Sequence, residues 1–244
     1  MTSTALTENG ELWEEQARNY IAWVRKPDFD SYWHYRDQFF ALLPPPGAAT
    51  LDLGCGEGRV SRDLVAHGHR VTGVDASPTL LDAAREAARE LDQASTYLLA
   101  DAANLPFDDA SFDLVVAYNV LMDVDDLAGS VREAARVLRP GGRLCLAIVH
   151  PMMDVGRIDQ ESGEYRISLR HSYFQPRKVA DTVTRDGLTM TFTGWARPMG
   201  EYASALCAAG LPIELIEEPR FTKQGASPLA KLIPYHLWMR AEKR

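Results

Sequence analysis

Three aspartates that lie in or directly after short apolar runs are the residues best suited to bind a ligand. Asp52 lies two residues before the glycines Gly54 and Gly56, Asp75 ends the next apolar run, and Asp101 follows a third. The two glycines let the backbone turn sharply and approach a ligand where a Cβ atom would collide. A carboxylate at the end of the second run suits the two hydroxyls of a ribose. The spacing therefore predicts a nucleoside-containing ligand.

The glycine pattern G-x-G-x-G disfavours two common classes of phosphate ligand. The phosphate-cradling loop G-x-x-x-x-G-K-[ST] is absent, and the dinucleotide pattern would need a third glycine where this chain has Arg59. Asp52, beside the turn, would repel a pyrophosphate but suits a cationic amine. S-adenosylmethionine (SAM) carries an ammonium and a sulfonium and has no phosphate, so the pattern favours SAM as the cofactor.

Alternating strands and helices position these residues from Thr50 to His150. Apolar runs that end at turns predict strands, and longer amphipathic stretches predict helices, which is the pattern of a parallel α/β sheet. Ligands bind such sheets at the carboxyl ends of the strands. After the first run, helices are expected over Glu57–His67, Pro78–Leu91 and Asp125–Leu138, and strands over Val71–Asp75, Ser95–Ala100, 111–119 and Arg143–Val149.

The combination of motifs resembles a known enzyme class. It consists of Thr50-Leu51-Asp52-Leu53-Gly54-Cys55-Gly56-Glu57-Gly58, the run that begins Asp101-Ala102, and Arg139-Pro140-Gly141-Gly142. In these motifs the chain resembles class I SAM-dependent methyltransferases, within the group similar to the ubiquinone/menaquinone-biosynthesis enzymes that have a methyltransferase type 11 domain. Outside Thr50 to His150 only the general architecture is similar. The resemblance implies a Rossmann-like, doubly wound α/β sheet of seven strands in the order 3-2-1-4-5-7-6, with the seventh antiparallel.

The resemblance also implies which residues contact the cofactor and its product, S-adenosylhomocysteine. Asp52 and the backbone of Gly54, Cys55 and Gly56 are expected to hold the methionine part. Asp75, with Ala76 beside it, is expected at the ribose, and Asp101 with Ala102 at the adenine. Asn119 is expected nearest the reacting sulfur.

Two aromatic-rich helices are predicted before the core, over Glu11–Lys26 and Phe29–Leu43, with Asp28 as N-cap of the second. The resemblance implies that residues 1–46 form a lid over the SAM site, ahead of a SAM-binding core at 47–150. The alternative is that the aromatic side chains simply pack on the sheet. The candidate substrate-binding residues are Tyr20, Trp23, Tyr32 and Trp195.

After His150 the pattern changes. Residues 151–163 are expected to be loop-like, and Asp186-Gly187 between alternating runs predicts a β-hairpin. We interpret residues 151–196 as an inserted cap on the substrate side; a flat surface hairpin is the alternative. Residues 197–244 should return to the core as a helix, Arg197–Ala209, and two strands, Leu211–Glu217 and Pro234–Lys243.

Catalytic residues are harder to assign, because methyl transfer needs alignment of the reacting atoms and at most one proton removal. His150 should end the fifth strand at the ligand edge and is the preferred base. Other candidates are Tyr20, His34 and His171, and an acceptor that needs no base is also possible. Asp123, Asp125 and Asp126 could bind a cation, but a helix N-cap explains them better, so no metal is expected.

Composition limits the function further. The chain has 244 residues, a formal net charge of −8 and three widely spaced cysteines, without clustered basic residues, a secretory signal or a bilayer-length apolar run. We therefore expect a cytoplasmic enzyme that binds neither nucleic acid nor membrane.

The favoured function is methylation of a small apolar or aromatic acceptor, with oxygen slightly ahead of nitrogen or carbon. A quinone-pathway C-methyltransferase, a non-catalytic SAM-binding regulator and, less favoured because of Arg59, a dinucleotide-dependent oxidoreductase are the alternatives. Acceptor identity and oligomeric state stay open.

Overall fold

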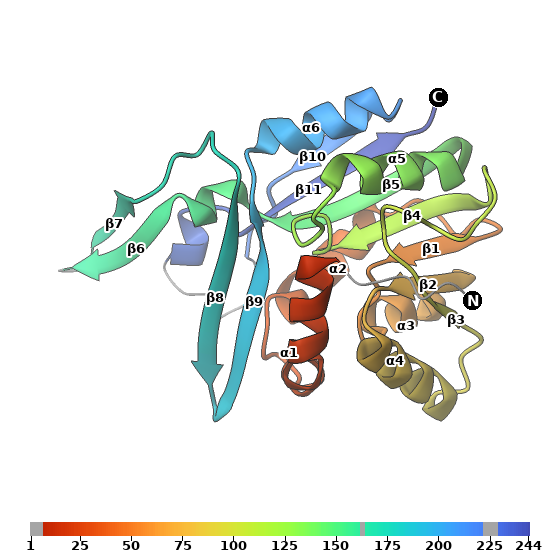
Figure 1. The fold of residues 1–244 in the computed structure, drawn as a ribbon, viewed down its shortest axis with the longest axis horizontal. Coiled ribbons are helices and arrows are strands. Elements are labelled where there is room, and N and C mark those ends of the chain that lie inside the picture. The colour runs from red at the N-terminus through yellow and green to blue at the C-terminus, as the bar shows by residue number, and fades with distance from the viewer. Residues whose placement is uncertain (1–6, 162–163, 222–228) are drawn as a thin grey trace.

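The computed structural model describes residues 7–161, 164–221 and 229–244. Its centre is a seven-stranded sheet in the order β10-β11-β5-β4-β1-β2-β3 (Figure 1). Its strands are β1 (Thr50–Leu53), β2 (Val71–Asp75), β3 (Thr96–Leu99), β4 (Phe112–Tyr118), β5 (Leu138–Val149), β10 (Ile213–Glu217) and β11 (His236–Glu242). β11 is antiparallel to both β5 and β10, and the other neighbouring strands are parallel. The predicted strand order and the antiparallel last strand are confirmed.

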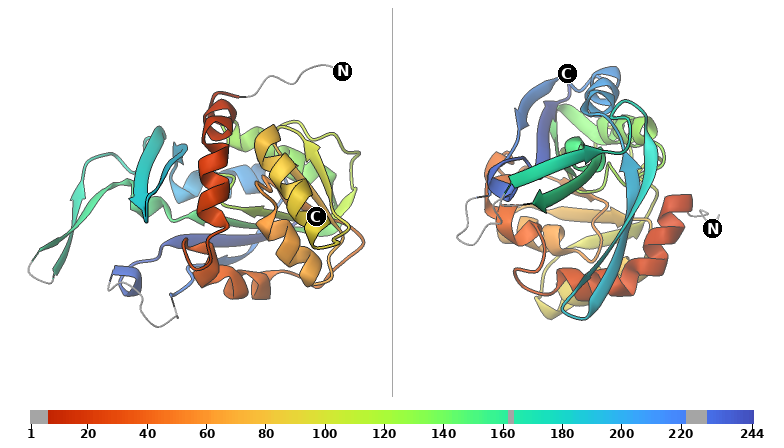
Figure 2. Two further views of the ribbon diagram at one scale, coloured as in Figure 1. Left: turned by 90° about the horizontal axis from the view of Figure 1, so that it is seen from below. Right: turned by 90° about the vertical axis from the view of Figure 1, so that its left-hand side faces the viewer.

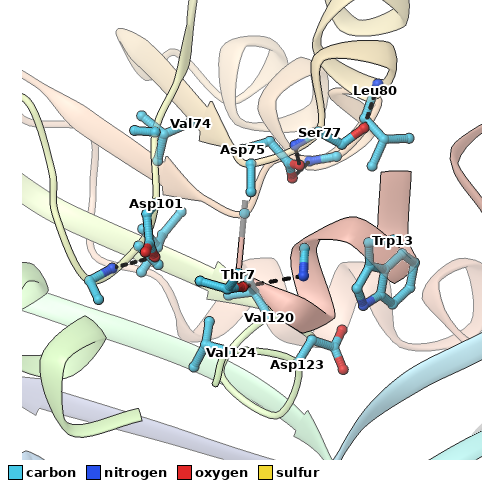
Figure 3. Close-up of a pocket in the computed structure, with 18 of the residues that line it drawn as sticks. Thr7, Trp13, Val74, Asp75, Ser77, Leu80, Asp101, Val120, Asp123 and Val124 are labelled. Carbon is cyan, nitrogen blue, oxygen red and sulfur yellow. Dashed lines mark hydrogen bonds between the residues drawn. The ribbon is translucent and has the colours of Figure 1, made fainter. Parts of the chain in front are cut away.

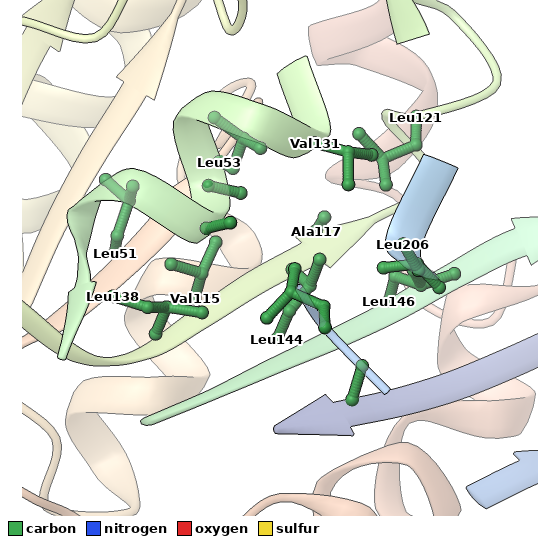
Figure 4. Packing of buried hydrophobic residues seen from close by; sticks show 14 of the residues in the cluster. Leu51, Leu53, Val115, Ala117, Leu121, Val131, Leu138, Leu144, Leu146 and Leu206 are labelled. Atoms are coloured by element: carbon green, nitrogen blue, oxygen red, sulfur yellow. The ribbon is translucent and has the colours of Figure 1, made fainter. Parts of the chain in front are cut away.

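Helices cover both faces of this sheet, as the continuous apolar character of the strands requires. Along β4, Val115 and Ala117 pack under α5 (Leu127–Val137) and α6 (Met199–Ala208) (Figure 4). The alternate residues Leu114 and Val116 pack on the opposite face, against α2 (Tyr32–Leu42) and α3 (Arg59–Ala66). α4 (Pro78–Glu90) closes the edge beside β2 and β3, where its alanines pack against Tyr97.

The two N-terminal helices differ from each other in position. α1 (Glu8–Val24) begins at Thr7, whose side chain accepts a hydrogen bond from the Gly10 N–H. α2 begins later than expected, and Asp28 is not its N-cap: Asp28 has φ 56°, and Ser31 occupies the cap position. Tyr32, Tyr35, Phe39 and Phe40 of α2 are buried against the sheet together with Trp238, so this helix forms part of the core.

The segment after β5 contains two hairpins. The expected loop over 151–163 is wrong in part: after a short 3₁₀ turn (Pro151–Asp154), β6 (Gly156–Glu161) pairs with β7 (Glu164–Leu169). The predicted second hairpin is confirmed as β8 (Arg177–Arg185) and β9 (Leu188–Ala196), with positive φ at Asp186 and Gly187. Met190 of β9 is fully buried beside Trp23 and Phe29, so this hairpin packs on α1 and is not a free surface ribbon (Figure 2). Among the described helices, none has the length and apolar character needed to cross a bilayer.

Candidate cofactor site

A pocket lies at the carboxyl ends of β1, β2 and β4, with α1 along its outer side (Figure 3). Because parallel strands end at the same edge, the loops after β1, β2, β3 and β4 converge there. The residues that line it are Thr7, Gly10, Trp13, Tyr20, Leu53, Gly54, Gly56, Val74, Asp75, Ala76, Ser77, Leu80, Ala100, Asp101, Ala102, Ala103, Tyr118, Asn119, Val120, Asp123, Val124, Asp125 and Asp126.

The turn after β1 is held tightly against its neighbours. Gly54 has φ +66°, and a Cβ atom there would lie 2.1 Å from Cγ2 of Val120, so only glycine fits. The Gly56 N–H donates to Oδ2 of Asp75 at 2.8 Å, and the Ser77 N–H donates to Oδ1 of Asp75 at 2.9 Å. Burial raises the pKa of this carboxyl, and the two N–H donors oppose the rise. Each carboxylate oxygen keeps a further lone pair, as a ribose diol requires.

The loop after β3 forms the second part of the pocket. Oδ1 of Asp101 accepts from the Ala103 N–H at 2.9 Å, which fixes the carboxylate at the pocket wall (Figure 3). The small side chains of Ala100, Ala102 and Ala103 leave space beside it for a flat ring. A carboxylate next to an apolar slot suits the exocyclic amine of adenine.

Two unpaired polar atoms at the end of β4 also indicate a ligand. Both residues line the pocket, and the side-chain oxygen of Asn119 and the hydroxyl of Tyr118 are buried without a hydrogen-bond partner among the residues that the structure describes. Asn119 is also held at φ +54°. Buried polar groups are nearly always paired, so a bound molecule is expected to supply the partners. The residues present thus fit SAM, with its ammonium, ribose hydroxyls and adenine amine.

Two of the predicted cofactor residues lie behind the pocket wall. Asp52 is 1% exposed, and its Oδ2 accepts from the Ser61 hydroxyl at 2.6 Å, away from the pocket lining. Burial raises the pKa of Asp52 to about 7. Cys55 packs among Leu81, Ala84 and Tyr97. Direct contact of the Asp52 carboxylate with the cofactor stays a prediction. The position of Asp52 behind the pocket wall does not favour it.

α1 covers the pocket through residues that the sequence did not single out. The Glu14 carboxylate accepts from the hydroxyls of Ser77 and Thr79 at the start of α4. At the other end of the pocket, the Asn9 N–H donates to Oδ2 of Asp125 at 3.0 Å. Trp13 lines the pocket seven residues before Tyr20, on the same side of the helix. The seven-residue spacing from Tyr20 could have predicted that Trp13 lines the pocket. No local sequence pattern distinguishes Glu14 or Asn9.

The four predicted substrate residues separate in the structure. Tyr20 lines the pocket, and burial raises its pKa to about 12. Trp195 lies just behind the wall, where its Nε1 donates to Oδ1 of Asp125 at 3.0 Å. Trp23 packs against Phe29 and Phe192, and Tyr32 is buried in the core beside Tyr118. The structure therefore brings Tyr20 to the pocket and leaves Trp23 and Tyr32 outside its lining.

His150 also lies outside the pocket lining, although it follows β5 as expected. Its Nδ1 accepts from the Met152 N–H at 3.2 Å, and its Nε2 faces Oε1 of Glu218 at 3.0 Å. Both ring nitrogens therefore have partners on the protein. His34 and His171 do not line the pocket either.

The acidic cluster after β4 divides into different roles. Oδ1 of Asp126 accepts from the Gly129 N–H at 2.8 Å and caps α5, as expected. Asp125 accepts hydrogen bonds from the Asn9 N–H and from the Trp195 side chain. Burial acts to raise the pKa of the Asp125 carboxyl, but these hydrogen bonds, first of all that from Asn9, outweigh burial and lower the pKa. Within the described ranges, no group of three or more His, Cys, Asp or Glu side chains is arranged to hold a metal ion.

The charge of the lining residues is one-sided. Of the lining residues that the structure describes, five are aspartates, at positions 75, 101, 123, 125 and 126, and none is Lys, Arg or His. Such a surface favours a ligand with positive charge and disfavours a pyrophosphate. The absence of the third glycine of the dinucleotide pattern points the same way.

Comparison with known proteins agrees with this chemistry. A family described as a methyltransferase domain matches residues 51–146. A demethylmenaquinone methyltransferase of Tropheryma whipplei (strain Twist) is 35% identical over 171 residues, covering 68% of this chain and 67% of that protein. A 27-O-demethylrifamycin SV methyltransferase of Amycolatopsis mediterranei is 40% identical over 114 residues, 45% of this chain and 42% of that protein. The crystal structure of a SAM-dependent methyltransferase from Mesorhizobium loti has a TM-score of 0.69 and 28% identity, and covers 88% of this chain and 99% of that one.

Fold, pocket and relatives together define the class of protein. The chain belongs to the class I SAM-dependent methyltransferases, in the group similar to the quinone-biosynthesis enzymes. SAM is its cofactor.

Proposed function

We propose that this enzyme methylates a small apolar or aromatic molecule, and that the accepting atom is a hydroxyl oxygen in preference to nitrogen or carbon. The observation that carries the proposal is the composition of the outer pocket wall. Trp13 of α1 lies there near Val120, Val124 and the carboxyl group of Asp123 on the β4–α5 loop (Figure 3). Tyr20 of α1 lines the same pocket. Aromatic and apolar walls with one carboxylate suit a largely apolar acceptor that must lose a proton.

The charge distribution narrows the acceptor class. A phosphorylated acceptor or a nucleic acid would need basic side chains, and the described part of the lining contains none. The bound cofactor supplies the electrophilic methyl group, and the protein's own residues orient the acceptor, exclude water and accept the proton. The names of relatives support oxygen as the acceptor atom: they include the 27-O-demethylrifamycin SV methyltransferase and an O-methyltransferase of Aspergillus sclerotiorum.

A second candidate is methylation at carbon of a quinone-pathway intermediate. The demethylmenaquinone methyltransferase from Tropheryma whipplei supports it, because the match to that protein extends over about two thirds of both chains. The apolar outer pocket would suit such an acceptor as well.

A labelled-methyl assay distinguishes these possibilities. The enzyme is incubated with SAM that carries a ¹³C methyl group and with panels of phenols and alcohols, amines, and quinols. Release of S-adenosylhomocysteine reports turnover, and the ¹³C shift of the product reports whether the methyl group is on oxygen, nitrogen or carbon. The proposal expects turnover with hydroxyl acceptors; methyl groups found only on nitrogen or carbon would overturn the oxygen preference.

A further inference from the structure

Asp123 differs from the other carboxylates of the pocket in its hydrogen bonding. Asp75 and Asp101 accept backbone N–H groups, Asp125 holds Trp195, and Asp126 caps α5. Among the described residues, no group hydrogen-bonds or ion-pairs with the Asp123 carboxylate. Its two oxygens are therefore available to a molecule in the pocket.

The backbone around Asp123, in contrast, is fixed from several directions. The Asp123 N–H donates to Val120 O at 2.8 Å, and its own carbonyl accepts from Nδ2 of Asn9 in α1 at 2.5 Å. The Trp195 N–H of β9 donates to Met122 O at 2.8 Å, and Nη2 of Arg197 donates to Val124 O at 2.7 Å. A loop held by α1, β9 and the segment after β9 gives the carboxylate a defined position.

A glycine in β9 makes room for this carboxylate. A Cβ atom at Gly194 would lie 2.5 Å from Oδ1 of Asp123. The side chain therefore rests against bare backbone, on the side of the pocket opposite Asp75 and close to Trp13 (Figure 3). This is the end that the cofactor residues on β2 and β3 do not occupy.

We propose that Asp123 is the general base that takes the proton from the acceptor hydroxyl during methyl transfer. The inference rests on the proposed function. In this step the acceptor oxygen forms a bond to the methyl carbon, and the carbon–sulfur bond breaks with its electron pair going to sulfur. The hydroxyl proton moves to the Asp123 carboxylate, which becomes a neutral carboxyl and later releases the proton to water.

The groups that face Asp123 are consistent with this role. Burial raises the pKa of its carboxyl well above the ordinary value; Arg197 opposes the rise, and Asp75 and Asp154 add to it. Tyr20 of α1 and Tyr202 of α6 also face it, and burial raises the pKa of both phenols. A base of raised pKa accepts a proton more readily near neutrality than an ordinary aspartate does. Because the ionised form is the active one, turnover should fall as the pH falls through this raised pKa.

The test compares Asp123→Asn and Asp123→Glu with the wild type. Asp123→Asn should lower kcat by about 10²–10⁴, the usual contribution of a general base, while the Kd for SAM changes by less than about threefold. Asp123→Glu should recover part of the rate, and the acidic limb of the kcat profile should be absent from the residual activity of Asp123→Asn. Asp181→Asn, which removes an exposed carboxylate from β8, is the control and should keep wild-type kcat.

Three outcomes would overturn the assignment. The first is an Asp123→Asn enzyme with kcat within about threefold of wild type. The second is a loss of rate matched by an equal loss of SAM binding, which would make Asp123 a binding residue. The third is an Asp123 carboxyl that titrates at the ordinary aspartate pKa in the complex with S-adenosylhomocysteine. The titration is followed by ¹³C NMR, and the Asp123 signal is assigned by its absence from the spectrum of Asp123→Asn. That titration needs no acceptor. A wild type that methylates no hydroxyl acceptor, in contrast, shows that the proposed function itself has failed, and the base assignment with it.

Discussion

The cofactor half and the acceptor half of the pocket are built in different ways. The cofactor half consists of the turns after β1, β2 and β3, which lie within residues 50–104 and are fixed by backbone N–H groups donating to Asp75 and Asp101. The acceptor half joins α1, the β4–α5 loop and β9 through hydrogen bonds of Asn9 and Trp13, which link residues as far as 184 positions apart in the chain. One half is set by local turns, and the other by long-range contacts.

This difference has a consequence for dynamics. Turns that close over a few residues and lie on a buried sheet open only with the core. A single helix held over the pocket by a few side-chain hydrogen bonds can open alone. We propose that α1 opens as a lid to admit and release ligands while the cofactor turns keep their shape.

The largest effect should come from Gly54→Ala in the cofactor half. The alanine would combine left-handed strain of about 1–2 kcal/mol with overpacking of about 1–3 kcal/mol against Val120. We expect urea denaturation to show a loss of about 2–5 kcal/mol in the free energy of unfolding. Gly141→Ala is the matched control, because Gly141 has φ +78° but no atom within 4 Å of a new Cβ, and it should cost only about 1 kcal/mol. Equal losses in the two variants would show that the close approach to Val120 is unimportant.

Asp75→Ala should have the next largest effect, on cofactor affinity. Loss of a charge-assisted hydrogen bond to the ribose should weaken SAM binding by about 1.5–3 kcal/mol in calorimetry. The same variant also releases the N–H groups of Gly56 and Ser77, so the free energy of unfolding should be measured in parallel. Unchanged affinity would remove Asp75 from the ribose site.

A smaller effect is expected from Asn9→Ala at the joint between the halves. The variant removes the Nδ2 donor to the carbonyls of Asp123 and Thr193, and Asn9 is only 3% exposed, so α1 should open more easily by about 1–2 kcal/mol. Hydrogen exchange should rise in residues 8–24 and stay unchanged in β10 and β11. Asn19→Ala, which removes an exposed amide on the same helix, should leave exchange as it is. Faster exchange over the whole protein would mean that α1 is a fixed layer and opens only on global unfolding.

The smallest effect should come from His150→Asn. Both ring nitrogens are occupied by Met152 and Glu218, and the ring lies outside the pocket lining, so kcat should stay within about threefold of wild type. An asparagine keeps hydrogen bonding but cannot take a proton at neutral pH. A fall of about 10²-fold or more would return His150 to the role of base and move the chemistry away from Asp123.

The same comparison explains what could be predicted from the sequence. Glycines, strand-end acids and the Asp186-Gly187 turn act over a few residues, so the cofactor turn and the hairpin followed from local patterns. The strand order followed from the family resemblance that these motifs carry. The role of each aromatic residue could not be predicted in this way. Trp13, Trp23 and Tyr32 all lie in amphipathic helical stretches, and only tertiary packing decides which of them is buried in a core. Nothing local to Asp123 distinguishes it from Asp125 and Asp126. Its free carboxylate depends on Asn9, Gly194 and Arg197, which reach it from distant parts of the chain.

Calorimetric titration of the wild-type protein with SAM and, separately, with NAD tests the assignment most directly. A pocket with five aspartates, no basic residue and a G-x-G-x-G turn should bind SAM with one site per chain and give no heat with NAD. Asp123→Asn should bind SAM as the wild type does, because the carboxylate belongs to the acceptor half. Binding of NAD without binding of SAM would contradict the assignment of this pocket to a methyltransferase.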